Sequence, residues 1–364
     1  MSNRTIETLS AALGTRTESV FLNEFAAFPL ACRGEEYRIA LSSVGATLFM
    51  MNAGLTEVRE AWLVKSEGRV VGRVHANTSW TREGVGYIGF YEVDLRETDH
   101  ADVARELLGA ATTWLAGHGA LKVYGPIDWC TWFSYRFQTA QPEGYKSGRF
   151  FWWEPVNPPE FLTHWEAAGF VAEEHYHTKA AEHSATAPMS LTSDLMKPAY
   201  DAAVAEGYRF RPMKDGDDFM SEAEGLYEVN ASGFAGNFLF EPIPFALYKQ
   251  TISGIVGKVD FSLSFWVHSQ DDRPVGYVYC FADGEYAVGK SVVIMPGHRG
   301  KAISPALMHL TSHRAVELGI PTAVSALIRR GNVSDRITRT AEEHAVAPWR
   351  HEYVLYGKSV TPIS

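Results

Sequence analysis

The sequence predicts an α/β protein of two similar domains in tandem, each a mixed β-sheet flanked by helices (a mixed sheet of the α+β kind). The chain has 364 residues, which is enough for two domains of ordinary size. An internal repeat is visible, because the segment 67–74 has a counterpart 204 residues later, at 271–278. Both halves then follow the order β-β-α-β-α-β, which is typical of a mixed sheet covered by helices.

Two strands open the repeated part of each half. The segments 67–74 and 271–278 each combine a turn with alternating apolar residues, as expected for a hairpin that enters a strand. The second strands are predicted at 87–93 and 285–294.

An amphipathic helix follows each second strand and is ended by a glycine, Gly119 or Gly319. The residues of each stripe recur at steps of three and four, which places them on one helix face. The stripes are Val103, Leu107, Ala111 and Trp114 in the first half and Met308, Thr311, Ala315 and Leu318 in the second. Each helix is therefore expected to pack one face on a sheet.

The remaining elements complete the repeat. Apolar strands are predicted at 121–124 and 322–328. A helix that opens at two prolines and ends at a glycine follows at 158–169 in the first half. In the second half we expect a helix at 332–343 and a final strand at 353–356.

These elements divide the chain into an N-terminal domain at 1–181, a linker at 182–206 and a C-terminal domain at 207–364. The start of the linker, 182–188, is rich in small and polar residues. The aromatic segment 127–155 either lines a hydrophobic pocket or simply packs in the core.

Composition narrows the class of protein. No apolar run is long enough to span a membrane, and the first residues lack the apolar core of a signal peptide. The three cysteines Cys32, Cys130 and Cys280 lack metal-ligand spacing, so we expect buried free thiols, no metal and a cytoplasmic location. The pair His175 and His177 falls on one strand face, but it has no evident third ligand and is more simply a neutral surface pair.

The charge distribution favours a small polyanion as ligand. The net charge of −10 argues against general nucleic-acid binding. From Arg299 onward, however, nine basic residues face only five acidic ones. That region is locally positive, which suits a phosphate ligand, although a solvated basic surface is an equally simple explanation.

The most informative segment is the strand–loop–helix at 292–310. A strand ends at Pro296, a basic loop rich in small residues follows, and a helix starts at once. A helix N-terminus offers free backbone N–H groups and a positive dipole end to a diphosphate, and small residues let the backbone come close to it. The candidate binding residues are Val293, Ile294, Met295, Arg299, Gly300, Lys301, Ala302, Ile303 and Ser304.

This loop resembles the acyl-CoA diphosphate loop of the GCN5-related N-acetyltransferase (GNAT) superfamily, usually written Arg/Gln-x-x-Gly-x-Gly/Ala. Ala302 and Ser304 stand where glycines are usual. The resemblance extends to both halves and implies tandem GNAT-like domains, with acetyl-CoA or another acyl-CoA as co-substrate. In the second half it implies a first strand at 208–213, a first helix at 217–230 and a variable segment over the acceptor pocket at 234–245.

The first half keeps the order of elements without the loop. Its corresponding segment, 94–100, is acidic and has no glycine. Carboxylates at a helix N-terminus compete with a phosphate for the same N–H groups. We therefore expect the first half to bind CoA poorly or not at all, and to act structurally or shape the acceptor site.

The resemblance also implies a mechanism, in which an amine attacks a thioester directly. A backbone N–H near Val293 or Ile294 would hold the acyl carbonyl. Asn332 follows the fifth strand, where the family often has Asn beside the cofactor arm; equally, it caps the next helix. The tyrosine that many members use as acid is missing between Asn332 and Glu343.

The candidates for proton transfer are therefore Glu285 as base, or simply a solvated carboxylate, with Ser334 and His344 as nearby polar groups. The favoured function is an N-acyltransferase acting on the amine of a small molecule. One alternative is an aminoacyl transferase of the tandem Fem-like type that takes its donor from aminoacyl-tRNA. The other is a GNAT-fold scaffold without catalysis. No membrane partner is expected.

Overall fold

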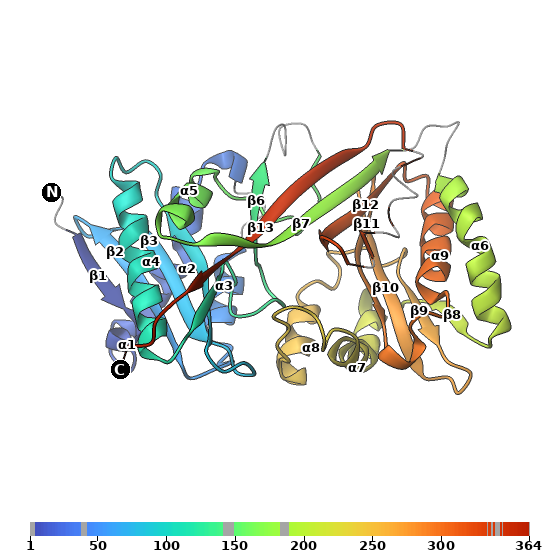
Figure 1. Ribbon diagram of the computed structural model, residues 1–364, viewed down its shortest axis with the longest axis horizontal. Helices are drawn as coiled ribbons and strands as arrows, with labels where there is room; N and C mark the ends of the chain where they lie inside the picture. Colours follow the sequence, from blue (N-terminus) through green and yellow to red (C-terminus); the bar gives the residue numbers. More distant parts are fainter. Residues whose placement is uncertain are drawn as a thin grey trace. The chain divides into compact units, whose positions relative to one another are not determined.

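The structure is a computed structural model, and it forms two compact units (Figure 1). One unit contains Met1–His175 together with Tyr353–Ser364, and the other contains Tyr176–Glu352. The residues that the structure describes are 4–37, 42–140, 149–182, 189–332, 334–335, 338, 343 and 345–363.

The first unit is a sheet of mixed direction with helices on both faces. The strand order is β1-β2-β3-β4-β5-β13, and only the β4–β5 pair is parallel. Its elements are β1 (Arg4–Thr8), α1 (Leu9–Ala12), α2 (Glu18–Cys32), η1 (Glu35–Tyr37), α3 (Val44–Met51), β2 (Arg59–Ser66), β3 (Arg69–Thr78), β4 (Val85–Val93), α4 (His100–Gly117), β5 (Lys122–Gly125), β6 (Phe137–Ala140), α5 (Glu160–Ala167) and β13 (Trp349–Ser359).

Alternation along the strands separates the two cores of this unit. Trp62 and Val64 of β2 pack with α4, whereas Ala61 and Leu63 of the same strand pack with α2 and α3. The predicted stripe of α4 is buried against the sheet, with Val103 fully covered. The three cysteines of the chain are buried and free, as expected.

The second unit repeats this plan. The strand order is β7-β12-β11-β10-β9-β8, and only the β11–β12 pair is parallel. Its elements are β7 (Val171–Glu182, from Tyr176 onward), α6 (Met189–Ala205), β8 (Arg209–Pro212), η3 (Gly216–Glu222), α7 (Ala223–Gly233), α8 (Phe245–Ser253), β9 (Phe265–His268), β10 (Pro274–Asp283), β11 (Tyr286–Ile294), η4 (Pro296–His298), α9 (Ile303–Glu317) and β12 (Thr322–Arg329).

Opposite faces of this sheet carry different helices. Val278 and Cys280 of β10 pack with α9, and α6 packs alongside α9 (Figure 1). Tyr277, on the other face of β10, hydrogen-bonds to Asn230 of α7. The α9 face is therefore apolar, whereas the α7 face contains buried polar side chains.

Two features differ from the division expected from the sequence. The final strand, β13, pairs with β5 of the first unit, and the second part of β7 pairs with β12 of the second unit. Each unit thus takes its last strand from the other half of the sequence, which local periodicity does not reveal. The expected linker, 182–206, also contains α6, because its residues Tyr200 and Ala203 bury apolar surface against the α9 core.

The predicted first helix of the second half is also divided in two. Residues 216–222 form the 3-10 helix η3, and α7 then continues to Gly233. Most of the helix expected at 332–343 falls outside the described residues.

Candidate functional site

The two parallel strands β11 and β12 pair along only part of their length. The pairing runs from Tyr286 opposite Thr322 to Gly289 opposite Ser325. Beyond this point β11 stays bonded to β10 as far as Ile294, but it no longer pairs with β12. The later part of β11 therefore has one edge that β12 leaves unpaired, and this edge leads directly into the loop before α9.

A β-bulge marks the place where the strands part. Cys280 of β10 lies opposite Gly289, and Tyr279 lies opposite Ser291, so Lys290 is the extra residue. A bulge disrupts the ladder at a defined point, here next to the last pair between β11 and β12. The pairing of β11 with β10 is regular at Val293 and Ile294, and alternate N–H groups of such a strand point to its other edge. An available N–H near these two residues therefore stays a prediction. The overlooked signal was Gly289, since glycine inside a strand often marks a bulge.

The loop before α9 exposes a run of free backbone donors. Within the described residues, none of the five N–H groups from Gly300 to Ser304 has a hydrogen-bond partner. Ala302 is the N-cap residue of α9 in the left-handed conformation (φ 56°), and it provides no side-chain cap. Gly300 and Lys301 are exposed, and a methyl group at Gly300 would meet no atom within 4 Å. Five free donors at a helix N-terminus, with Gly300 and Lys301 exposed and Ile303 buried, form a ready-made anion site.

The side chain of Arg299 supports this loop from behind. Its Nε donates to the carbonyl of Ile294 at 3.1 Å, and a terminal nitrogen donates to the carbonyl of Gly233 at 2.8 Å. The guanidinium therefore holds the loop to the ends of β11 and α7, whereas we had expected it to add charge at the ligand. Val293 lies under Gly233, where an added methyl group would come within 2.2 Å of its Cγ1.

Two further basic groups lie next to the free donors. The Lys301 ammonium is 5.9 Å from the centre of the Tyr208 ring, and the Tyr208 hydroxyl pairs with Nδ1 of His298 at 2.8 Å. Met295 is held by a bond from its N–H to the carbonyl of Val275. Lys301 remains exposed, so it is the charged side chain of the loop that is available to an anion.

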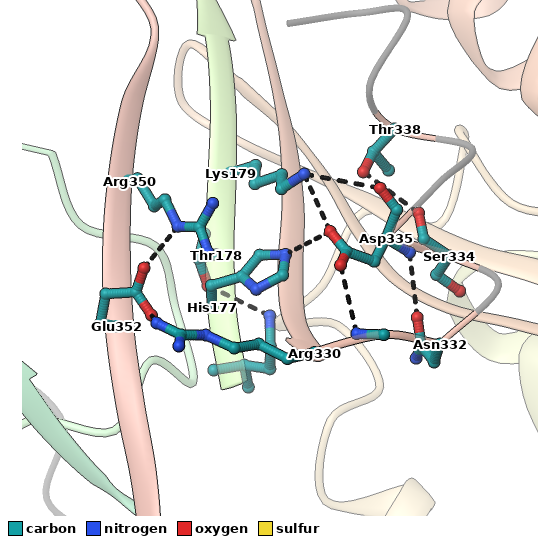
Figure 2. Close-up of polar contacts among 12 residues, drawn as sticks. His177, Thr178, Lys179, Arg330, Asn332, Ser334, Asp335, Thr338, Arg350 and Glu352 are labelled. Carbon is teal, nitrogen blue, oxygen red and sulfur yellow. Dashed lines mark hydrogen bonds and ion pairs between the residues drawn. The ribbon is translucent and has the colours of Figure 1, made fainter. Parts of the chain in front are cut away.

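A tight turn follows β12 and contains two of the predicted residues (Figure 2). The Oδ1 atom of Asn332 accepts the N–H of Asp335 at 2.9 Å, which is a helix-capping bond, as one of our two interpretations required. The carbonyl of Ser334 accepts both the N–H and the hydroxyl of Thr338. Asn332 is exposed and Ser334 half-buried.

Of the other proposed proton-transfer residues, Glu285 is far from this turn in the extended chain of β11. Glu285 is exposed at the start of β11, at the end of the strand where the pairing with β12 begins. Nine residues of extended chain, roughly 30 Å, separate it from Ile294. His344 lies outside the described residues.

Three residues outside the predicted donor site lie at this turn. His177 and Lys179 of β7 both contact the carboxylate of Asp335 (Figure 2). His177 is fully buried, so it is not the surface residue that we expected. Among the described residues there is no group of three or more His, Cys, Asp or Glu side chains suited to a metal ion.

The first unit closes the corresponding gap with its own chain. Its strands β4 and β5 pair only as far as Tyr87 opposite Tyr124, and the N–H of Ile127 then donates to the carbonyl of Ile88 at 2.8 Å. The carboxylate of Asp128 accepts the N–H of Phe90, at a bulge in β4.

The space around the two glycines at these bulges, Gly89 and Gly289, differs between the units. A methyl group at Gly89 would lie 2.0 Å from the carbonyl oxygen of Ile127, whereas one at Gly289 would lie 3.5 Å from its nearest atom, the Val324 oxygen. The gap beside Gly89 is therefore filled by backbone.

The loop of the first unit is also satisfied internally. Asp94 accepts the N–H of Arg96 at 3.1 Å and is bonded by the side chains of Arg96 and Arg69. Burial alone would raise the pKa of Asp94, but the bonds from Arg96 outweigh it and hold the pKa below its usual range. This carboxylate thus occupies donors that a phosphate would need.

Comparisons with known proteins agree with this geometry. Residues 226–335 match the model of the acetyltransferase (GNAT) family. A tandem GNAT protein from the clavulanic acid biosynthesis pathway is 14% identical over 100% of both chains, with a TM-score of 0.51. A GCN5-related N-acetyltransferase from Kribbella flavida is 10% identical, with a TM-score of 0.52 over 98% of this chain and 72% of that one. The chain is therefore a tandem GNAT-fold protein, and its second unit contains the matched GNAT domain.

A third similar structure is much longer than this chain. It is a GCN5-related glucosamine N-acetyltransferase region in a fungal multi-domain GH3 β-N-acetylglucosaminidase, with 12% identity and a TM-score of 0.55. The match covers 98% of this chain but only 38% of the fungal one. A comparison with curated proteins found no match. No helix among the described residues is long and apolar enough to cross a membrane.

Proposed function

We propose that this protein is an N-acyltransferase that moves an acyl group, an acetyl group in the first place, from acyl-CoA to the amine of a small molecule. The observation that carries the proposal is the run of five free backbone N–H groups from Gly300 to Ser304. A diphosphate is the group that such a run binds best, because each oxygen finds a donor without any side chain being desolvated. Lys301 adds a positive charge at the same place.

The unpaired edge of β11 supports the same conclusion. An extended ligand such as a pantetheine arm carries amides, and it would bond to strand edges as another strand does. The edge available to it runs from Ser291 to Ile294, where the diphosphate loop starts. The first unit fills its gap with Ile127 and Asp128, so we propose that each chain binds one acyl-CoA.

The reaction requires the protein mainly to position its reactants. A neutral amine attacks the thioester carbonyl carbon, the new C–N bond forms, and the C–S bond breaks. The amine loses one proton and the departing CoA thiolate gains one, which leaves an amide and a free thiol. A backbone N–H of the later part of β11, near Val293 or Ile294, would stabilise the negative charge that develops on the carbonyl oxygen.

We keep Glu285, Ser334 and His344 as candidates for these proton transfers and put Ser334 first. Ser334 belongs to the turn that follows β12, close in sequence to the point where β12 leaves β11. Glu285 lies at the opposite end of β11 and would need a chain of water molecules to act as a base. Asn332, which caps the same turn, is proposed to face the cofactor arm.

Isothermal titration with acetyl-CoA tests the donor site. Ser304→Glu puts a carboxylate in the first turn of α9, which stabilises the helix but competes with the diphosphate. We expect the affinity for acetyl-CoA to fall roughly tenfold or more, while the thermal midpoint stays equal or rises. Ser304→Gln is the matched neutral control and is expected to bind nearly as the wild type does.

The outcomes separate the possible functions. Wild-type binding with one site per chain, lost in Ser304→Glu, supports the acyl-CoA enzyme. Equal binding by the two variants would refute the proposed diphosphate site. No heat with acetyl-CoA would favour an aminoacyl-tRNA donor or a scaffold, and a steep salt dependence of tRNA binding would distinguish these two. A panel of amines, with glucosamine among them because of the fungal relative, would then identify the acceptor.

A further inference from the structure

We propose that three consecutive residues of β7, His177, Thr178 and Lys179, are positioning residues for the donor site of the second unit. They precede the matched GNAT domain at 226–335, in a strand that continues the first half of the sequence. The inference deepens the proposed function and rests on it only where acyl-CoA binding is the measurement.

Thr178 holds β12 in an irregular shape at the place where β12 leaves β11. The pairing of β12 with β7 shifts register between Ser325 and Ile328, and Leu327 has a φ of 57°. The Leu327 N–H, turned out of the ladder, donates to Oγ1 of Thr178 at 3.1 Å. The last pair between β11 and β12 is at Ser325, so the bulge begins where the strands part.

Lys179 and His177 lie on the same face of β7 and meet one carboxylate (Figure 2). Nζ of Lys179 is 2.9 Å, and Nε2 of His177 3.1 Å, from Oδ1 of Asp335. The side chains of His177 and Lys179 are only 0% and 7% exposed, so water competes little for these contacts. Neither ring nitrogen of His177 makes a hydrogen bond among the described residues, so Lys179 is the residue of the strand that mainly holds the carboxylate, and His177 packs against it.

Asp335 in turn closes the turn that carries the predicted site residues. Its Oδ2 accepts the N–H of Gly331 at 3.2 Å, and its own N–H donates to Oδ1 of Asn332 at 2.9 Å. The side chain of Asp335 thus joins β7 to Gly331, and the backbone N–H of the same residue bonds to the Asn332 side chain. Movement of the carboxylate would move Asn332 and Ser334 with it.

Electrostatics agrees with this arrangement. Burial alone would raise the pKa of Asp335, but the bonds from Lys179 and from the Gly331 N–H outweigh it and hold the pKa at about 2. Burial, and then the charge of Arg350, lowers the pKa of His177. The carboxylate is thus anionic and the imidazole neutral near pH 7, so Lys179 is the cation that balances Asp335.

The decisive variant is Lys179→Met in the full-length chain, with acetyl-CoA binding measured by titration calorimetry. We expect the dissociation constant to rise about five- to tenfold, because Asp335 loses its charged partner and the turn loosens. Lys179→Arg keeps the cation and is expected to restore most of the affinity. Lys122→Met is the matched control, since Lys122 forms an equivalent 2.8 Å ion pair with Glu173 in the first unit. It should leave the affinity unchanged.

A double variant tests whether Lys179 acts through Asp335. If it does, Lys179→Met combined with Asp335→Asn binds no more weakly than Asp335→Asn alone, because the second change removes a contact already lost. Wild-type affinity in Lys179→Met, an equal loss in Lys122→Met, or additive losses in the double variant would each overturn the proposal.

Hydrogen exchange keeps this test independent of the proposed function. In Lys179→Met the Gly331 and Asp335 amides are expected to exchange faster than in the wild type, with no ligand present. Thr178→Val should do the same at Leu327, whereas Thr178→Ser keeps the hydroxyl and the protection. If wild-type protein fails to bind acetyl-CoA, the proposed function falls, and unchanged exchange at these amides would separately refute the positioning role.

Discussion

The left-handed conformation of Ala302 allows a specific prediction about protein stability. It is the N-cap residue of α9 with φ 56° and ψ 8°, a conformation that costs an L-residue roughly 1–2 kcal/mol. Glycine adopts it without this penalty but loses roughly 0.4–1 kcal/mol through the greater freedom of the unfolded chain. Ala302→Gly is therefore expected to stabilise the protein by about 0.5–1 kcal/mol.

The control is the same substitution where the backbone is right-handed. Ala199, in the middle of α6, is partly buried like Ala302 and belongs to the same unit. Ala199→Gly is expected to destabilise by about 1 kcal/mol, because glycine weakens a helix interior. The two substitutions should thus change the free energy of unfolding in opposite directions.

Urea unfolding followed by circular dichroism gives the free energy of unfolding of both variants from the midpoint and the slope of the transition. Acetyl-CoA affinity should not fall in Ala302→Gly, since glycine lets an anion approach at least as closely. If Ala302→Gly proves as destabilising as Ala199→Gly, the left-handed conformation at the start of α9 is wrong, and the arrangement of free donors that depends on it is wrong too.

Two other predictions concern packing and acid stability. In Gly233→Ala the new methyl group would meet Cγ1 of Val293 at 2.2 Å, so we expect the free energy of unfolding to fall by about 1–3 kcal/mol and acetyl-CoA binding to weaken. Gly236→Ala is the control, because a methyl group there would meet no atom within 4 Å. It should be nearly neutral in the same denaturation and titration assays. Burial, and then the charge of Arg59, lowers the pKa of His75 to about 3, and among the described residues neither ring nitrogen has a hydrogen-bond partner. The unfolded chain takes up this proton near pH 6.5 and the folded chain near pH 3, so stability falls as the pH drops between these values, by about 2 kcal/mol from pH 7 to pH 5. Urea midpoints at both pH values should show a smaller decrease in His75→Leu; an equal decrease would contradict the buried, neutral imidazole.

Much of the fold could be predicted because its signals are local. Val103, Leu107 and Ala111 define one face of a helix, and Gly119 indicates where that helix ends. Neither signal depends on the rest of the chain. The same holds for the loop, where a strand ends before Pro296 and a helix starts at Ile303. Its anion-binding character follows from the unpaired N–H groups that any helix N-terminus has.

Other parts of the site could not be predicted, because they depend on which segments meet. Arg299 looked like a ligand for phosphate, but two backbone carbonyls, those of Gly233 and Ile294, receive its guanidinium. No pattern near His177 indicates Asp335, which lies 158 residues later in the sequence. A side chain's partner is set by the packing of distant elements, whereas its chemical type is all that the sequence shows.

By itself, then, the sequence determined the repeated order of strands and helices, the amphipathic faces and the exposed basic loop before α9, because each arises from hydrogen bonds and burial within a short stretch of chain. Only the tertiary structure decided that β7 pairs with β12 and that β13 pairs with β5. It also decided that Ile127 and Asp128 fill the gap between β4 and β5, whereas β11 and β12 part. Strand edges are chemically alike, so the choice among them is made by the packing of the whole unit.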